Sequence, residues 1–296
     1  MTTALGCILP LRVSGGVTNA GKSYGAHNRG NMERASLLLT SLSQNFLEPA
    51  PLDVIMIVRS DEYAEVRREI KKYPRLKITI VVENEIIPAI TEMDISGWVK
   101  QQALKLAAAE QLGFNFSLVC DADVICCSPF NCYSLINAGR ALTQWEPRAI
   151  HPNWWENSAL VLGCASNTKT YGMSVTPQLL ARDVVRSLRA CIELKYRVSA
   201  WNFLLSRSCT WTEYTLYTLH AEEVGLIRQR HLMPHEIGSP LHSSHSYWDE
   251  VGYAKWLSTD WESSDCRGIF MICQSRVGAS PRAVHDRLRA AGILNH

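Results

Sequence analysis

Two aspartates one residue apart lie in an otherwise apolar stretch of the chain. Residues 116–130 read FSLVCDADVICCSPF, with Asp121 and Asp123 near the middle. Two carboxylates at this spacing repel each other and are costly to bury unless a cation compensates their charge. Carboxylate oxygens suit Mg²⁺ or Mn²⁺, which proteins hold together with substrate phosphates. The pair predicts a divalent cation that bridges a diphosphate; the alternative is a solvated turn that carries two aspartates.

The segments before the pair predict the edge at which the carboxylates lie. Strand-like apolar runs at LGCILPLRV, LDVIMIVRSDE, LKITIVVE and FSLVCDADVICC alternate with helical patterns, of which SGWVKQQALKLAAAEQLG is the longest, with Ser96 as N-cap and Gly113 at its end. Continuous apolar strands that alternate with helices predict a parallel sheet covered on both faces. Ligands of such sheets bind at the carboxyl ends of the strands. Asp121 begins such an end, so both aspartates are expected to face a ligand.

The second half of the chain is less regular. Residues 152–163 and 171–177 are predicted as short strands or strand-loop units, and a helix is predicted to begin near Pro177. A further helix is expected in TWTEYTLYTLHAEEVG, with Thr212 as N-cap and Glu213 in its first turn. The strand GIFMICQS and the helix SPRAVHDRLRAAG follow near the end. No repeat or linker interrupts the chain, which favours one domain.

Composition restricts the class of protein. The 296 residues are 47% hydrophobic and carry a net charge of +2, which is typical of a soluble globular protein and argues against a nucleic-acid partner. No apolar run reaches the roughly 18 residues of a transmembrane segment, and the N-terminus lacks the basic region of a signal peptide. Most of the ten cysteines lie in or beside apolar runs and none forms a CxxC pair. We therefore expect reduced thiols, no zinc site and a cytoplasmic location.

One motif suggests another activity. Residues 16–23, GVTNAGKS, match the phosphate-loop pattern G-x-x-x-x-G-K-[ST] after a predicted strand, as in a nucleoside-triphosphate-dependent kinase. That mechanism requires a helix that begins at the Gly-Lys pair, so that its amide groups face the phosphates. Gly25, Asn28, Gly30 and Asn31 follow Lys22 and break such a helix. The kinase stays an alternative, and a loop after the first strand is favoured.

The order of these motifs resembles a GT-A-type glycosyltransferase, and more narrowly a little-characterised bacterial family of such enzymes. GW-x-x-QQ-x-x-K, the D-x-D strand followed by Pro-Phe, GMSVTP and TEYTLY carry the resemblance, which covers residues 5–280. It implies an α/β fold with a mixed, mainly parallel sheet flanked by helices in a single domain over 1–296. Residues 1–130 would bind the nucleotide sugar and residues 131–296 the acceptor. The implied reaction is metal-dependent transfer of a sugar from a nucleotide-diphosphate sugar, with a UDP-sugar favoured, to a sugar or small-molecule hydroxyl.

The resemblance also implies a donor site and a metal site. Asp123 would be the principal ligand of Mn²⁺ or Mg²⁺, and Asp121 would touch the ribose or reach the metal through water. A third ligand would be His242 or His245, although loop histidines are often ordinary polar residues. The expected donor-binding residues are Pro10, Leu11, Arg12, Asp61, Lys100, Gln101, Lys105, Asp121, Ala122 and Asp123. For the two lysines the alternative is a solvated surface charge.

An inverting transferase needs a base for the acceptor hydroxyl, and Glu213 is the candidate. A helix N-terminus would lower its pKa, and a capping glutamate is the alternative. Trp154 and Trp155 are expected to stack on the acceptor unless they are core aromatics, with Tyr171, Met173 and Thr176 on the opposite wall. Sugar nucleotidyltransferases are disfavoured because the chain lacks their glycine-rich opening, whereas a non-catalytic nucleotide-sugar-binding relic stays open. Donor sugar, acceptor, stereochemistry and oligomeric state are not decided by the sequence.

Overall fold

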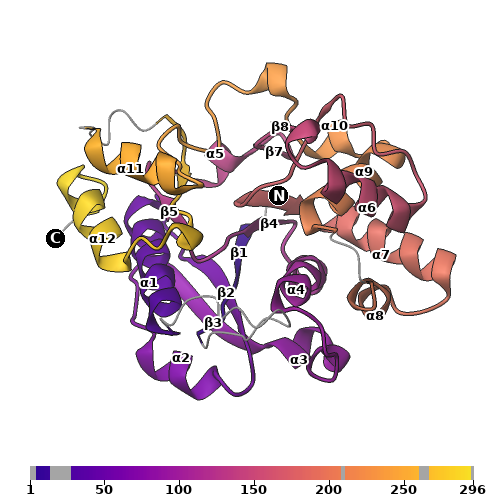
Figure 1. The fold of residues 1–296 in the computed structure, drawn as a ribbon, viewed down its shortest axis with the longest axis horizontal. Coiled ribbons are helices and arrows are strands. Elements are labelled where there is room, and N and C mark those ends of the chain that lie inside the picture. The colour runs from indigo at the N-terminus through magenta and orange to yellow at the C-terminus, as the bar shows by residue number, and fades with distance from the viewer. Residues whose placement is uncertain (1–4, 14–27, 208–210, 260–266, 295–296) are drawn as a thin grey trace.

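A five-stranded sheet organises the molecule (Figure 1). The computed structural model describes residues 5–13, 28–207, 211–259 and 267–294. The strands are β1 (Leu5–Pro10), β2 (Leu52–Val58), β3 (Leu76–Val82), β4 (Phe116–Val119) and β10 (Gln178–Ala181), in the order β10-β4-β1-β2-β3. Strands β1, β2, β3 and β4 run parallel to one another, and β10 pairs antiparallel with β4. The predicted α/β fold with a mixed, mainly parallel sheet is confirmed.

Helices cover both faces of this sheet. The helix α1 (Asn28–Asn45) follows β1, and α2 (Tyr63–Glu69) follows β2. Asn28, Gly30 and Asn31 were expected to break a helix, but they lie at the start of α1, so that expectation was wrong. The helix α4 (Gly97–Gln111) lies on the opposite side of the sheet from α1 and packs against β1, β4 and α7 (Arg182–Tyr196) (Figure 1). Its ends are those predicted: the Ser96 hydroxyl accepts a hydrogen bond from the Val99 amide, and Gly113 has a positive φ of 85°. The position of α4 matters for function because its inner face meets the end of β4.

The strand that carries the two aspartates is interrupted. After β4 ends at Val119, the Val124 amide donates to the Asp121 carbonyl at 3.1 Å, which closes a turn over residues 121–124. The chain then enters β5 (Val124–Cys126), which pairs antiparallel with β11 (Phe270–Ile272) in a separate small sheet. The prediction of one continuous strand was therefore wrong. The aspartates lie in a connection between two sheets.

Two predictions for the second half were also wrong. Residues 152–163 are expected as a short strand or strand-loop unit but form the helix α6 (Pro152–Leu162), with proline in its first turn and Gly163 as a left-handed C-cap. The helix expected from Pro177 begins later, as α7 (Arg182–Tyr196), because residues 178–181 add a strand to the edge of β4. The helix α9 (Glu213–Glu223) begins as predicted, capped by Thr212.

Shorter elements complete the chain. They are α3 (Glu83–Ile86), η1 (Pro88–Thr91), α5 (Cys132–Leu135), β6 (Ile136–Asn137), β7 (Arg140–Ala141), β8 (Glu146–Pro147), η2 (Arg148–Ile150), β9 (Tyr171–Gly172), α8 (Ala200–Leu205), α10 (Ile227–Arg230), η3 (Pro234–Glu236), α11 (Glu250–Ser258), η5 (Ser275–Val277) and α12 (Pro281–Ala290). The main hydrophobic core contains side chains from Leu5 to Phe270, so both halves contribute to it. The cysteines within the described ranges are free thiols. No described helix has the length and apolar character to cross a membrane.

Candidate functional site

A buried lysine joins two carboxylates at the carboxyl end of β4. The Nζ of Lys105 lies 2.8 Å from Asp121 Oδ1 and 2.8 Å from Glu213 Oε1. The Lys105 side chain is 2% exposed and that of Glu213 is 1% exposed, whereas Asp121 is 29% exposed. The three groups come from α4, from the turn after β4 and from the first turn of α9. Sequence analysis named all three residues but did not predict the ion pairs between them.

The charges of this triad depend on one another. Burial lowers the pKa of Lys105, but Asp121 and Glu213 together raise it by more than burial lowers it. The pKa therefore lies well above its ordinary value, and the ammonium is charged. Burial raises the pKa of Glu213, while Lys105 opposes that rise. The second oxygen of Glu213, Oε2, is buried without a hydrogen-bond partner among the described residues. Glu213 is therefore held by Lys105 and closed to solvent, which makes it a poor base for an incoming hydroxyl.

Asp121 is fixed from two further sides. Gln101, one helical turn before Lys105, donates from Nε2 to Asp121 Oδ1 at 3.0 Å. The backbone amide of Asp121 donates to the Thr176 hydroxyl at 3.2 Å. The structure thus brings together four of the predicted site residues, and Thr176 supports the D-x-D turn.

Asp123, two residues further on, is half-buried and has no cationic side chain in contact with it in the described part of the chain. The Ser275 amide donates to its Oδ2 at 3.3 Å, and the Cys273 amide donates to its backbone carbonyl at 2.8 Å. Burial, followed by the negative charge of Asp121, raises the pKa of Asp123 to about 6. The Ser275 amide and the positive charge of Arg34 lower this pKa, but by less than burial and Asp121 raise it, so the carboxylate is only partly compensated.

This pKa predicts a pH dependence of stability. The folded protein holds a proton on Asp123 between its ordinary pKa of 3.8 and about 6, whereas the unfolded chain releases it. The contribution of Asp123 to the free energy of unfolding therefore falls as pH rises through that window. We expect Asp123→Asn to gain stability relative to the wild type between about pH 4 and about pH 7, measured by urea unfolding. If the free energies of unfolding of Asp123→Asn and the wild type differ by the same amount at both pH values, Asp123 does not have a raised pKa in the folded protein.

The predicted histidine ligands do not join the aspartates. His242 is buried, and its Nε2 lies 3.0 Å from the carbonyl oxygen of Pro177, which requires the proton on Nε2. Burial lowers the pKa of His242 to about 4. The His245 amide donates to the Ser243 hydroxyl at 3.1 Å. Among the residues that the structure describes, no group of three or more His, Cys, Asp or Glu side chains forms a candidate ligand set. Neither histidine is therefore supported as the third ligand.

The two aspartates nevertheless suit a cation completed by a substrate. The hydrogen bonds described above use Oδ1 of Asp121 and Oδ2 of Asp123, so one oxygen of each carboxylate lies outside them. Mg²⁺ in enzymes is bound by one or two carboxylates together with substrate phosphates and water rather than by a complete protein cage. The residues present fit that kind of site.

Basic side chains lie at the neighbouring strand ends. Arg12 follows β1, Arg59 follows β2 and Lys100 lies in the first turn of α4. Burial raises the pKa of Glu83 and all three cations lower it, which places them around one carboxylate. The Arg12 guanidinium packs against Gly97, where a Cβ would collide with it.

The other predicted donor residues take several roles. Asp61 is exposed and pairs with Arg59 at 2.6 Å, so its carboxylate is engaged. Pro10 ends β1 and Leu11 is buried, with its amide bonded to the Ile57 carbonyl. Ala122 is half-buried between the two aspartates. The phosphate-loop motif of residues 16–23 lies outside the described residues.

An aromatic cluster adjoins the triad. Trp154, in the first turn of α6, stacks on His151 with ring centroids 4.0 Å apart and lies 6.3 Å from Trp98 of α4. The Thr215 hydroxyl contacts the Trp154 carbonyl at 3.4 Å, which joins the cluster to the start of α9. Sequence analysis identified Trp154 but missed Trp98, although it precedes Gln101 and Lys105 on the same helical face.

The remaining residues that were predicted to bind the acceptor do not lie together in one site. Trp155 is fully buried beneath the Arg148 guanidinium, whose centre lies 4.2 Å from the ring, and Met173 is fully buried in the core. Tyr171 is 53% exposed on β9. Trp155 and Met173 are therefore core residues, and their predicted contact with an acceptor is not supported.

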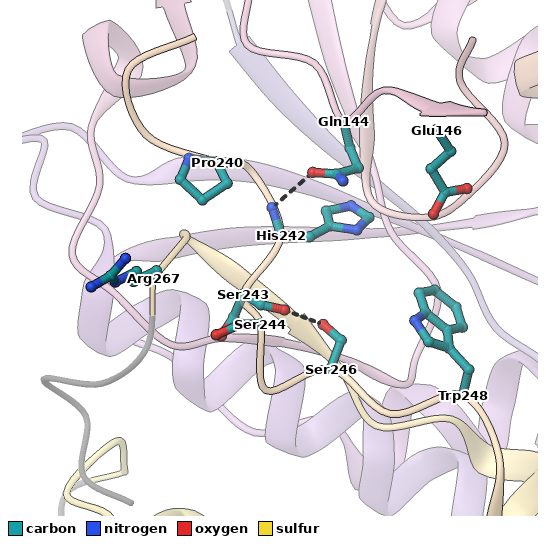
Figure 2. Close-up of a pocket in the computed structure, with 9 residues that line it drawn as sticks. All are labelled: Gln144, Glu146, Pro240, His242, Ser243, Ser244, Ser246, Trp248 and Arg267. Atoms are coloured by element: carbon teal, nitrogen blue, oxygen red, sulfur yellow. Dashed lines mark hydrogen bonds between the residues drawn. The ribbon is translucent and has the colours of Figure 1, made fainter. Parts of the chain in front are cut away.

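A cleft of about 470 Å³ is drawn in Figure 2, and neither Asp121 nor Asp123 is among the residues that line it. Its lining residues are Gln144, Glu146, Pro240, His242, Ser243, Ser244, Ser246, Trp248 and Arg267. Sequence analysis missed Glu146, since a single glutamate outside any motif gives no signal.

Fold and site together define an α/β protein with a carboxylate-rich site at the carboxyl ends of parallel strands. The chain belongs to a family of unknown function, DUF6492, whose model matches residues 2–291. No curated protein matches it.

Two solved structures similar to this one are glycosyltransferases. The first is the mannosyltransferase Ktr4p from S. cerevisiae, with 10% identity, a TM-score of 0.44 and coverage of 74% of this chain. The chain spans 65% of the yeast chain, just under two thirds. The second is mouse xyloside xylosyltransferase 1 in its apo form, with 12% identity, a TM-score of 0.42 and coverage of 77% of this chain and 84% of that chain.

Proposed function

We propose that the chain is a metal-dependent glycosyltransferase. It would move a sugar from a nucleotide-diphosphate sugar, with a UDP-sugar favoured, to a hydroxyl of a sugar or small-molecule acceptor. The observation that carries the proposal is the unbalanced charge at the carboxyl end of β4. Asp121 and Glu213 share the single ammonium of Lys105. Asp123 lies two residues beyond Asp121 without a salt bridge of its own in the described part of the chain, and the positive charge of Arg34 offsets its burial and the charge of Asp121 only in part. A divalent cation would balance the remaining negative charge and hold a diphosphate.

The surrounding residues support binding of such a donor. Lys105 and Gln101 both hold Oδ1 of Asp121, so the carboxylate would enter the cation site already oriented. Arg12, Arg59 and Lys100 lie near the strand ends where a nucleotide would lie. Because Arg59 pairs with Asp61 and all three cations surround Glu83, the phosphates of a nucleotide would compete with these carboxylates for them. When bound, the cation would stabilise the charge that develops on the leaving diphosphate. In this proposal residues 1–130 and 131–296 form the donor and acceptor halves of one domain.

A nucleotide screen tests the proposal. We expect UDP or another nucleoside diphosphate to raise the melting temperature by on the order of several °C in Mn²⁺ and not in EDTA, because a ligand that binds only the folded state stabilises it. Asp123→Ala should abolish the shift, whereas Lys22→Ala should preserve it. Release of nucleotide diphosphate from a nucleotide sugar then separates a transferase from a non-catalytic binding relic. If ATP alone shifts the melting temperature and Lys22→Ala abolishes that shift, the kinase alternative is correct.

A further inference from the structure

The cleft beside the D-x-D turn combines a carboxylate, hydroxyls and an aromatic ring. Glu146 lies on β8, and His242 and Ser246 lie on a segment that runs along β11, where His242 bridges to Phe270 and Tyr247 to Cys273. Trp248 follows that segment and is 42% exposed. Figure 2 shows the Glu146 carboxylate and the Trp248 indole directed toward each other across the cleft. An indole face with nearby hydroxyls and a carboxylate is the chemistry that binds a sugar ring.

Glu146 is a carboxylate suited to proton transfer. The Ser174 hydroxyl donates to its Oε2 at 2.5 Å, and no salt bridge from a described lysine or arginine neutralises it. Burial raises the pKa of Glu146, and the Ser174 hydrogen bond lowers it. The other titratable or charged groups of the cleft are His242, which is neutral near pH 7 because its pKa lies at about 4, and Arg267. Glu213, by contrast, is 1% exposed and held by Lys105.

One short segment connects the cleft to the aspartates. Ser174 contacts Glu146, Thr176 contacts the amide of Asp121, and the Pro177 carbonyl contacts His242. Two residues of chain span at most about 7 Å, so the cleft and the D-x-D turn are adjacent. An acceptor in the cleft would therefore lie next to a donor whose diphosphate is held at the turn.

The cleft shares part of its wall with a smaller hollow. A second hollow of about 230 Å³ shares Gln144 and Pro240 with the first and adds Trp145 and Ile237 to its wall. The Trp145 indole is fixed by a 2.8 Å hydrogen bond from Nε1 to the Leu232 carbonyl. An aromatic ring therefore lies in the wall of each hollow, Trp248 in the first and Trp145 in the second. The two adjoining hollows are called the groove below.

We propose that this groove binds a saccharide acceptor and that Glu146 takes the proton of the attacking hydroxyl; the inference rests on the proposed function. The acceptor oxygen forms a bond to the anomeric carbon of the donor, and the bond from that carbon to the diphosphate oxygen breaks. Its electron pair leaves with the nucleotide diphosphate, and the acceptor proton passes to a Glu146 oxygen and then to water. Ser174 acts as a positioning residue for Glu146.

The test uses the full chain, Mn²⁺ and the nucleotide sugar that binds most tightly in the screen described above. Release of nucleotide diphosphate is measured with water alone and with a panel of p-nitrophenyl glycosides of mono- and disaccharides. We expect Glu146→Gln to lower release at least about 100-fold in both reactions, with the donor Kd unchanged. Glu156→Gln, an exposed glutamate on α6, is the matched control and should behave as the wild type. Because the base must be deprotonated, Ser174→Ala should move the acid limb of the pH–rate profile to higher pH.

For a glycoside that accelerates release with the wild type, Trp248→Ala should raise the KM for that glycoside about 10-fold. Tyr133 is an exposed aromatic residue outside the cleft, so Tyr133→Ala should leave this KM unchanged. If the donor binds and Glu146→Gln releases nucleotide at the wild-type rate, the role of Glu146 is refuted while the proposed function stands. If no glycoside raises release above the water rate, the saccharide assignment fails. If no nucleotide sugar binds the wild type, the proposed function fails and this inference falls with it.

Discussion

Asp123→Asn is expected to abolish metal-dependent donor binding and to lower sugar transfer by on the order of 10³-fold. The substitution keeps the size of the side chain but removes one of the two negative charges that would hold a divalent cation. Asp123 has no ion pair to compensate it in the described structure, and its pKa is raised to about 6 by burial and by Asp121. Its charge is therefore available for a cation. Isothermal titration with UDP and Mn²⁺ gives the change in Kd directly.

Two controls separate this effect from misfolding. Asp286→Asn changes an exposed carboxylate on α12 and should leave the Kd unchanged. The free energy of unfolding of Asp123→Asn at neutral pH should be no lower than that of the wild type, because the substitution removes a repulsion with Asp121. A folded Asp123→Asn protein that binds UDP and Mn²⁺ within threefold of the wild-type Kd would contradict the account.

Lys105→Met is expected to lower the free energy of unfolding by about 3–5 kcal/mol. The ammonium is 2% exposed and lies 2.8 Å from both Asp121 and Glu213, so its loss leaves a buried glutamate without its cation. Methionine fills a similar volume, which limits the contribution of a cavity to the result. Urea unfolding at neutral pH measures the change.

A second substitution tests whether the unpaired charge of Glu213 causes the loss of stability in Lys105→Met. Glu213→Gln removes the buried negative charge, so the double variant Lys105→Met/Glu213→Gln should recover part of the stability lost in Lys105→Met. Lys100→Met, on the half-buried side of α4, should cost less than about 1 kcal/mol. If Lys105→Met unfolds at the wild-type urea concentration, the buried ion pairs do not stabilise the fold.

Short-range sequence patterns predicted most of the strands and helices that carry the site residues. The apolar runs of β1–β4 and the capping residues Ser96 and Thr212 fixed the elements that carry Lys105 and Glu213. Asp121 was placed at a strand end, and Gln101 and Lys105 on one helical face, because these relations depend on residues close in the chain.

Other features depend on contacts between distant residues. Lys105 and Glu213 are 108 positions apart, and no spacing rule relates them. The break after Val119 arises because β5 pairs with β11, which comes about 150 residues later in the chain. The helix α6 carried local signals, Pro152 and Gly163, but its apolar residues near Trp155 favoured a strand. Glu146 becomes a candidate site residue only through its hydrogen bond with Ser174 and its place in the wall of the cleft, which the sequence does not show.

A crystal of the wild-type protein soaked with UDP and MnCl₂ tests the central claim most directly. The account predicts an anomalous manganese peak in contact with a carboxylate oxygen of Asp123 and with the diphosphate of UDP. UDP bound without a cation at Asp121 and Asp123, or a nucleotide held instead by residues 16–23, would contradict it.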